Sequence, residues 1–128
     1  MPQLKLSAVI ENPSANARVT VNLQMYIFKE DGSFIVYCPA LDLSAYGDSE
    51  EQTKKAFEDI LGININYMLN KGTFFDDLKM HGWKVKGKKQ RKIKAPTFDE
   101  MLKRGGALHD ITSNKDYTKY SQDVSIPA

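Results

Sequence analysis

The clearest pattern in the sequence is an alternation of apolar and other residues between Arg18 and Phe28. One set of alternate positions is wholly apolar: Val19, Val21, Leu23, Met25 and Ile27. A period of two residues is typical of a β-strand that buries one face. The other set begins polar at Thr20 and ends aromatic at Tyr26 and Phe28. We therefore expect the far end of this strand to be covered on both faces, by a helix and by a partner protein.

A hairpin is predicted next. Glu30-Asp31-Gly32 is a tight turn between β-prone runs, because Gly32 can take the positive φ that other residues avoid. Phe34 to Tyr37 form the second strand, which ends at Cys38-Pro39 because proline has no N–H to donate to a sheet. Leu41 to Tyr46 predict a short third strand.

The longest predicted helix begins at Glu50 and ends around Asn70 to Gly72. Ser49 is its expected N-cap, Gln52 completes a capping box, and Gly72 occupies the usual position just past the end. Residues spaced by three and four predict a broad stripe that faces the sheet. The stripe consists of Thr53, Ala56, Phe57, Ile60, Leu61, Ile63, Asn64, Tyr67 and Met68.

The remaining segments give shorter signals. A second helix is expected between a Thr73 cap and Gly82, after which Trp83 turns back onto the core. Residues 83–94 predict an extended segment, read as a hairpin that turns within residues 87–90. Thr97 and Glu100 form a capping box for a helix from Phe98 to Arg104.

The two ends of the chain are polar. Leu4 to Ile10 alternate weakly, and suggest an edge strand or an arm that adds to another subunit, and residues 11–17 have the composition of a loop. Residues 107–128 are rich in Ser, Thr, Asn, Asp and Lys and predict a tail that is disordered or docks on a neighbouring subunit.

Together these elements predict an α+β domain. The sheet has three or four mostly antiparallel strands, with one long helix on one face and two short helices besides. The chain divides into an arm (residues 1–17), a core (18–82), a basic extended segment (83–95), and a short helix with a polar tail (96–128).

Composition limits the possibilities further. With 128 residues, of which 41% are hydrophobic and 27% charged, the chain suits one globular core. It has no apolar run near the roughly 20 residues of a membrane helix and no recognisable secretory signal, so we expect a cytoplasmic protein. The single cysteine excludes an internal disulfide.

Charge is distributed unevenly. Seven basic residues and no acidic ones lie between Trp83 and Lys94, which leaves 11 of the 18 basic residues in the rest of the chain, against all 16 acidic ones. The basic residues of the segment are Lys84, Lys86, Lys88, Lys89, Arg91, Lys92 and Lys94. An acidic body with one basic segment points to charged partners.

Three short runs carry a family resemblance. They are Asp31-Gly32-Ser33-Phe34-Ile35-Val36, then Pro39-Ala40-Leu41, then Gly47-Asp48-Ser49-Glu50-Glu51. They resemble the signature of HicB-type antitoxins over about half of the chain, although Asp42-Leu43 replace a Pro-Gly-Cys turn and Thr53 replaces an alanine. The resemblance implies a partial RNase H-like fold that does not cleave nucleic acid. It also implies a small basic HicA-like toxin, double-stranded-RNA-binding-like with a catalytic histidine, as partner.

The family usually adds a C-terminal DNA-binding module, and none can be built from this C-terminal third. Operator binding is therefore not expected. What remains is either the family's sequestration of an RNA-cleaving toxin in a toxin–antitoxin system, or a stand-alone, antitoxin-derived binding module whose toxin is absent. In both cases we expect a dimer or a larger homo-oligomer.

Catalytic chemistry is not expected. An RNase H-like outline would need converging carboxylates to hold two metal ions, and the candidates are Glu30, Asp31, Asp42 and Asp48. Each has a simpler role in a turn or beside a cap. His81 and His109 lack companion ligands, His81 suits a helix C-terminus, and Cys38 suits a buried filler. We therefore assign no catalytic residue, metal or cofactor, and a metal-dependent nuclease is the remotest alternative.

Two contact surfaces are predicted instead. The partner-binding candidates are acidic residues at the helix start and aromatic residues at the strand ends: Tyr26, Phe28, Tyr37, Tyr46, Asp48, Glu50 and Glu51. The basic segment is a candidate for toxin-independent binding of nucleic acid through its phosphates. Two other interpretations of this segment stay open: a solvated sheet edge, or a surface that pairs with the protein's own acidic body in an oligomer.

Overall fold

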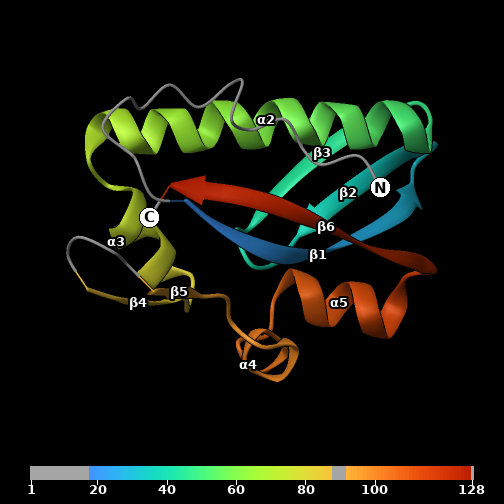
Figure 1. Cartoon of the computed structure of the whole chain (residues 1–128). Coiled ribbons are helices and arrows are strands. Elements are labelled where there is room, and N and C mark those ends of the chain that lie inside the picture. The colour runs from blue at the N-terminus through green and yellow to red at the C-terminus, as the bar shows by residue number, and fades with distance from the viewer. Residues whose placement is uncertain (1–17, 88–91, 128) are drawn as a thin grey trace.

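The computed structural model describes residues 18–87 and 92–127. At its centre lies a four-stranded antiparallel sheet in the order β3-β2-β1-β6 (Figure 1). Its strands are β1 (Arg18–Glu30), β2 (Ser33–Cys38), β3 (Leu43–Gly47) and β6 (Tyr117–Pro127). The predicted α+β class, the antiparallel sheet and the long helix on one face are confirmed. The RNase H-like assignment stays a prediction. No helix of the described chain is long and apolar enough to cross a membrane.

The predicted hairpin is confirmed, with a turn of two residues where three were expected. Glu30 pairs with Ser33, and Asp31 and Gly32 between them have φ values of 52° and 82°. Two successive residues with positive φ make the turn whose twist matches that of the strands, and glycine adopts this conformation without steric cost. This turn fixes the register of β1 against β2.

Helix α2 (Glu50–Lys71) covers one face of the sheet (Figure 1). The Ser49 hydroxyl accepts a hydrogen bond from the Gln52 amide, and Gly72, with φ 74°, ends the helix as predicted. The broad apolar stripe was only partly right. The buried residues of α2 are Thr53, Phe57, Leu61 and Ile65, which are spaced by four, and Gly62 beside them. By contrast, Ile60, Ile63 and Tyr67 of the predicted stripe are exposed.

Three short elements follow α2. Helix α3 (Phe74–Met80) ends at His81, whose Nδ1 lies 2.8 Å from the Asp77 carbonyl oxygen, as expected of a residue at a helix C-terminus. Strands β4 (Lys84–Lys86) and β5 (Lys92–Lys94) pair as the predicted antiparallel hairpin, whose turn lies largely outside the described residues. Helix α4 (Phe98–Lys103) begins with the complete Thr97–Glu100 capping box. The predicted strand at Leu4 to Ile10 and the loop at 11–17 also lie outside the described residues.

The prediction of a disordered or docked C-terminal tail was wrong. Residues Ala107–Asn114 form helix α5, and β6 pairs with β1 over eleven residues, from Phe28↔Tyr117 to Arg18↔Pro127. The segment is polar in composition because only one face of β6 is buried, through Gln122, Val124 and Ile126. Composition alone therefore did not indicate a core strand. The described chain therefore has three short helices rather than two, and the sheet core extends to its C-terminal end.

Helices α4 and α5 lie on the face of the sheet opposite α2 (Figure 1). This second layer explains why the second face of β1 ends in aromatic residues. Tyr26 is 1% exposed and Phe28 is 8% exposed, and Leu108 and Ile111 of α5 are buried as well. The far end of β1 is thus covered on both faces, but by the protein's own C-terminal segment rather than by a partner.

Candidate functional site

Acidic side chains gather at one end of the sheet. Lys29 pairs with Phe34 and Phe34 with Gly47, so the β1–β2 turn and the β3–α2 junction lie at the same end (Figure 1). Five exposed acids come from these two connections: Glu30, Asp31, Asp48, Glu50 and Glu51. We call this group, together with Tyr46, the acidic end. Acids at the start of α2 also stabilise the helix dipole.

Tyr46 is the exposed aromatic of the acidic end. It lies on β3 opposite Ile35, with 66% of its surface accessible. It lines a cavity of about 280 Å³ between the sheet and α5. Apolar residues Phe28, Ile35 and Ile111 contribute to this cavity, and Glu30 and Asp110 add carboxylates.

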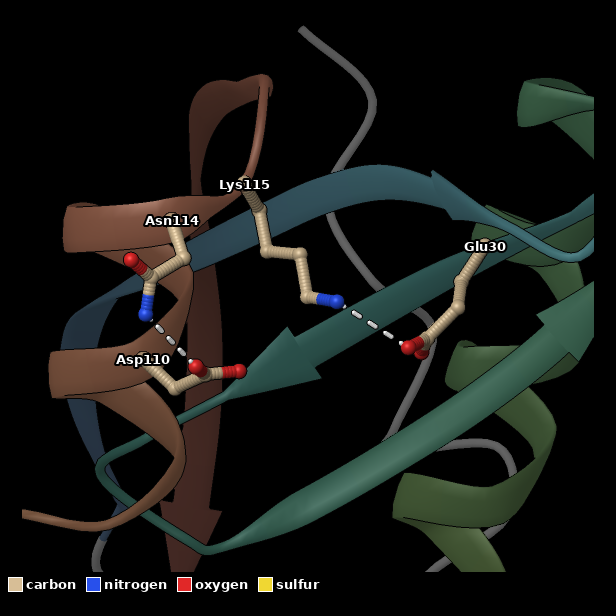
Figure 2. A network of polar contacts seen from close by, with 4 residues as sticks. All are labelled: Glu30, Asp110, Asn114 and Lys115. Carbon is tan, nitrogen blue, oxygen red and sulfur yellow. Dashed lines mark hydrogen bonds and ion pairs between the residues drawn. The ribbon is translucent and has the colours of Figure 1, made fainter.

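The polar contacts beside this cavity are shown in Figure 2. Lys115 Nζ lies 3.0 Å from Glu30 Oε1, which ties the end of α5 to the β1–β2 turn. Asn114 donates a hydrogen bond of 2.9 Å to Asp110 Oδ1. Lys115 neutralises part of the local charge, and its own pKa is raised by its hydrogen bond to Glu30. Among the residues that the structure describes, Asp31, Asp48, Glu50 and Glu51 make no ion pair.

The predicted partner-binding residues divide into two groups. Tyr46, Asp48, Glu50 and Glu51 are exposed and belong to the β3–α2 junction. Tyr26 and Phe28 were wrong as surface contacts, because both are buried in the core. Tyr37 is half-buried and donates a hydrogen bond of 2.7 Å to Asp42 Oδ1. Burial, and then this bond, raise the pKa of Tyr37 above its usual range.

The four carboxylates considered for a nuclease have other surroundings. Glu30 binds Lys115, Asp31 occupies the hairpin turn, Asp42 accepts from Tyr37, and Asp48 precedes the Ser49 cap. Within residues 18–87 and 92–127, no group of three or more His, Cys, Asp or Glu side chains could hold a metal ion. His109 is exposed on α5. Cys38 is fully buried, as predicted, and burial raises the pKa of its thiol to about 12.

The basic segment forms a two-stranded ribbon with four lysines on one face. Lys84 pairs directly with Lys94, and Lys86 with Lys92, and all four are exposed. We call these four the lysine ribbon. The intervening pair, Val85 and Ile93, is half-buried against the core. The other predicted contacts, Lys88, Lys89 and Arg91, lie outside the described residues.

The lysine ribbon and the acidic end lie at opposite ends of the molecule (Figure 1). The ribbon follows α3 at the C-terminal end of α2, whereas the acidic end surrounds the N-terminus of α2. The molecule therefore presents two surfaces of opposite charge that could bind different partners.

Sequence reasoning missed the cavity beside Tyr46. Its far wall is α5, which supplies Asp110, Ile111 and Lys115 from a segment interpreted as a tail. The signal available was Leu108 and Ile111, two apolar residues spaced by three in a polar stretch. Such a short repeat is too weak to predict a helix by itself.

Comparisons with protein-family models, with curated proteins and with solved structures find no match to this chain. The interpretation of its surfaces therefore depends on their geometry and on the residues that build them.

Proposed function

We propose that this protein is a non-catalytic, HicB-like binding module that sequesters a small basic, RNA-cleaving HicA-like toxin through its acidic end. The observation that carries the proposal is the exposed Tyr46, which stands directly before the junction that carries Asp48, Glu50 and Glu51 and lines a cavity. An RNA-cleaving protein needs a basic surface to hold its substrate. An acidic surface with an aromatic anchor is complementary to such a surface.

The residues behind the family resemblance support the proposal by what they build. Asp31 and Gly32 form the hairpin turn, and Ser49 caps α2. Gly47 is required by close packing, because a Cβ there would lie 2.5 Å from Thr53 Oγ1 and 2.9 Å from its amide nitrogen. The quoted runs thus shape the unit of three strands and a helix that carries the acidic end.

The cavity beside Tyr46 suits the side chain of a basic partner. Its apolar lining can contact the aliphatic part of a lysine or arginine, and Asp110 can meet the charge, whereas Glu30 is already paired with Lys115 of the same cavity. Long-range attraction between an acidic and a basic surface would also speed the encounter. Covering the RNA-binding surface of the toxin blocks cleavage without any chemistry by this chain.

The test uses a small basic protein with a double-stranded-RNA-binding-like fold encoded beside this chain. We expect it to bind this protein and to lose its RNA cleavage activity when the two are mixed. Tyr46→Ala combined with Glu50→Gln and Glu51→Gln should weaken binding by about 100-fold, since interface anchors and their charges contribute roughly 2 kcal/mol or more.

A control variant changes one acid at the other end of the molecule. Asp76→Asn on α3 removes an exposed acid away from the acidic end and should leave binding unchanged. If such a partner binds equally well to the triple variant, the acidic end is not its contact. If it neither binds nor is inhibited, the HicB-like role is wrong.

A second function is favoured by one observation, the direct pairing of lysines across the ribbon. Like charges directly opposite each other destabilise a sheet, so the paired lysines of the ribbon repel each other. An anion bound over this face would remove the repulsion. Nucleic-acid phosphates supply such an anion at regular spacing. The second candidate is therefore toxin-independent binding of nucleic acid by the lysine ribbon.

Salt dependence tests this second function. Four phosphate contacts predict that log K falls against log salt with a slope of about −3 to −4. Changing Lys84, Lys86, Lys92 and Lys94 to glutamine should abolish most of the affinity. A control with Lys55→Gln and Lys79→Gln, exposed lysines on α2 and α3, should retain it. Binding that is insensitive to salt, or to the ribbon substitutions, would exclude this function.

A further inference from the structure

A third feature of the molecule is a cavity of about 310 Å³ on the second face of the sheet, between β1 and the segment that leads from β5 into α4. Polar side chains Asn22, Gln24 and Lys119 and the aromatic ring of Phe98 line it. Its other lining residues are mainly apolar: Leu23, Tyr26, Ala40, Ala95, Pro96 and Met101. We call it the amide pocket.

The two amide side chains are held in order by a chain of hydrogen bonds. Gln24 Nε2 donates to Asn22 Oδ1 at 3.2 Å, and Asn22 Nδ2 donates to Asp123 Oδ1 at 2.9 Å. A carboxamide has two N–H donors and a carbonyl oxygen with two lone pairs. Gln24 therefore keeps capacity to donate and to accept toward a ligand in the pocket, which is the combination that the edge of a nucleobase requires.

Phe98 adds an exposed aromatic ring to the pocket. Phe98 is 43% exposed at the first turn of α4, and Lys119 Nζ lies 5.9 Å from the centroid of its ring. Exposed aromatic side chains next to basic ones are the usual means by which proteins stack unpaired bases. Lys119 is placed to contact a phosphate next to such a base.

The amide pocket lies next to the lysine ribbon. Ala95 and Pro96 in its wall directly follow Lys94 of β5. Lys84 and Lys94 also act on Glu100 of α4: the pKa of this carboxyl is lowered, first by its hydrogen bond from the Thr97 amide and, more weakly, by these two lysines. The ribbon therefore leads directly into the wall of the amide pocket.

We propose that the amide pocket takes an unpaired nucleobase, stacked on Phe98 and bonded by Gln24, while the lysine ribbon holds the neighbouring phosphates. This inference rests on the proposed binding of nucleic acid by the ribbon and specifies its class as single-stranded. A duplex can place its phosphates on the ribbon, but its paired and stacked bases cannot enter the pocket without being flipped out.

The experiment compares a fluorescent RNA single strand of ~12 nucleotides with the same strand annealed to its complement, by anisotropy at low salt. The wild-type protein should bind the single strand about tenfold more tightly than the duplex. Phe98→Leu should remove most of this preference and leave duplex binding unchanged, and Gln24→Ala should reduce it. Tyr67→Leu is the matched control, because Tyr67 is an exposed aromatic on α2, across the sheet.

The outcomes distinguish base binding in the amide pocket from nucleic-acid binding by the lysine ribbon. If both RNA forms bind equally, and Phe98→Leu affects neither while the ribbon substitutions weaken both, the ribbon binds nucleic acid and the pocket inference is wrong. If neither form binds at low salt, both the ribbon function and the inference are wrong. A single-strand preference lost in Phe98→Leu but kept in Tyr67→Leu supports both.

Discussion

The indole Nε1 of Trp83 donates a hydrogen bond of 2.6 Å to the main-chain oxygen of Ala40. This bond joins the residue that precedes the lysine ribbon to the loop between β2 and β3. Both residues are buried, with Trp83 3% and Ala40 4% exposed. Trp83 therefore fixes the ribbon to the core of the sheet.

The first prediction concerns this bond. Trp83→Phe should lower the free energy of unfolding by about 1–3 kcal/mol, because it leaves the buried Ala40 oxygen without its donor. Urea denaturation measures the change. Tyr67→Phe, at an exposed aromatic position, is the control and should stay within about 0.5 kcal/mol of wild type. Equal stability of the two variants would show that the Trp83 bond contributes nothing.

The second prediction concerns Gly47 at the β3–α2 junction. Gly47→Ala should destabilise the protein by about 1–3 kcal/mol, because the added Cβ would lie within 3.0 Å of three atoms of Thr53. Two of these are backbone atoms, so Thr53→Ala in the same chain should not restore stability. Thermal denaturation of the single and double variants checks both statements. Full rescue by Thr53→Ala would contradict the packing described for the junction.

The third prediction concerns the C-terminal strand. Ile126 is fully buried and pairs with Val19 of β1, so Ile126→Ala should cost about 2–5 kcal/mol of unfolding free energy. Thr118→Ala, at an exposed position of the same strand, is the control. A C-terminal segment that is a tail, as its composition first suggested, would tolerate both changes equally.

The fourth prediction concerns alkaline pH. Burial is the first cause that raises the pKa of Tyr26, Tyr37 and Tyr120, and it raises that of Cys38 to about 12. The folded state keeps these protons while the unfolded chain releases them at the ordinary values of about 8.5 for cysteine and 10 for tyrosine. The contribution of these groups to the free energy of unfolding is therefore fully present below these pKa values. It is lost as pH rises through and above them.

Tyrosinate absorbance and thermal denaturation over this pH range measure the effect. Three of the six tyrosines should resist ionisation until the protein unfolds. The Cys38 thiol should stay unreactive to a disulfide reagent in the folded protein and react on unfolding. Ionisation of all six tyrosines near pH ~10 with the fold intact would contradict the burial described here.

Features set by neighbouring residues could be predicted from the sequence. The Asp31-Gly32 turn, the Ser49 cap and the Thr97–Glu100 capping box each depend on residues within a few positions of one another. The lysine hairpin was predicted for the same reason, because Val85 and Ile93 alternate with lysines on both sides of its turn.

Features set by distant residues could not be predicted. Val124 of β6 pairs with Val21, about a hundred positions earlier, and only this partner shows that the polar C-terminal stretch is a core strand. Because α5 in the same segment was not predicted, Tyr26 and Phe28 were interpreted as surface contacts, although both are buried. On α2 the spacing of apolar residues was compatible with two adjacent faces of the helix. Only packing against the sheet determines that the face from Thr53 to Ile65 is the buried one.

The acidic end as the contact for a basic toxin is tested most directly by hydrogen–deuterium exchange of this protein alone and with that partner bound. If the acidic end is the contact, exchange slows at residues 44–51 and at the β1–β2 turn, while exchange at the lysine ribbon is unchanged. Slower exchange at the ribbon with none at residues 44–51 would contradict this contact.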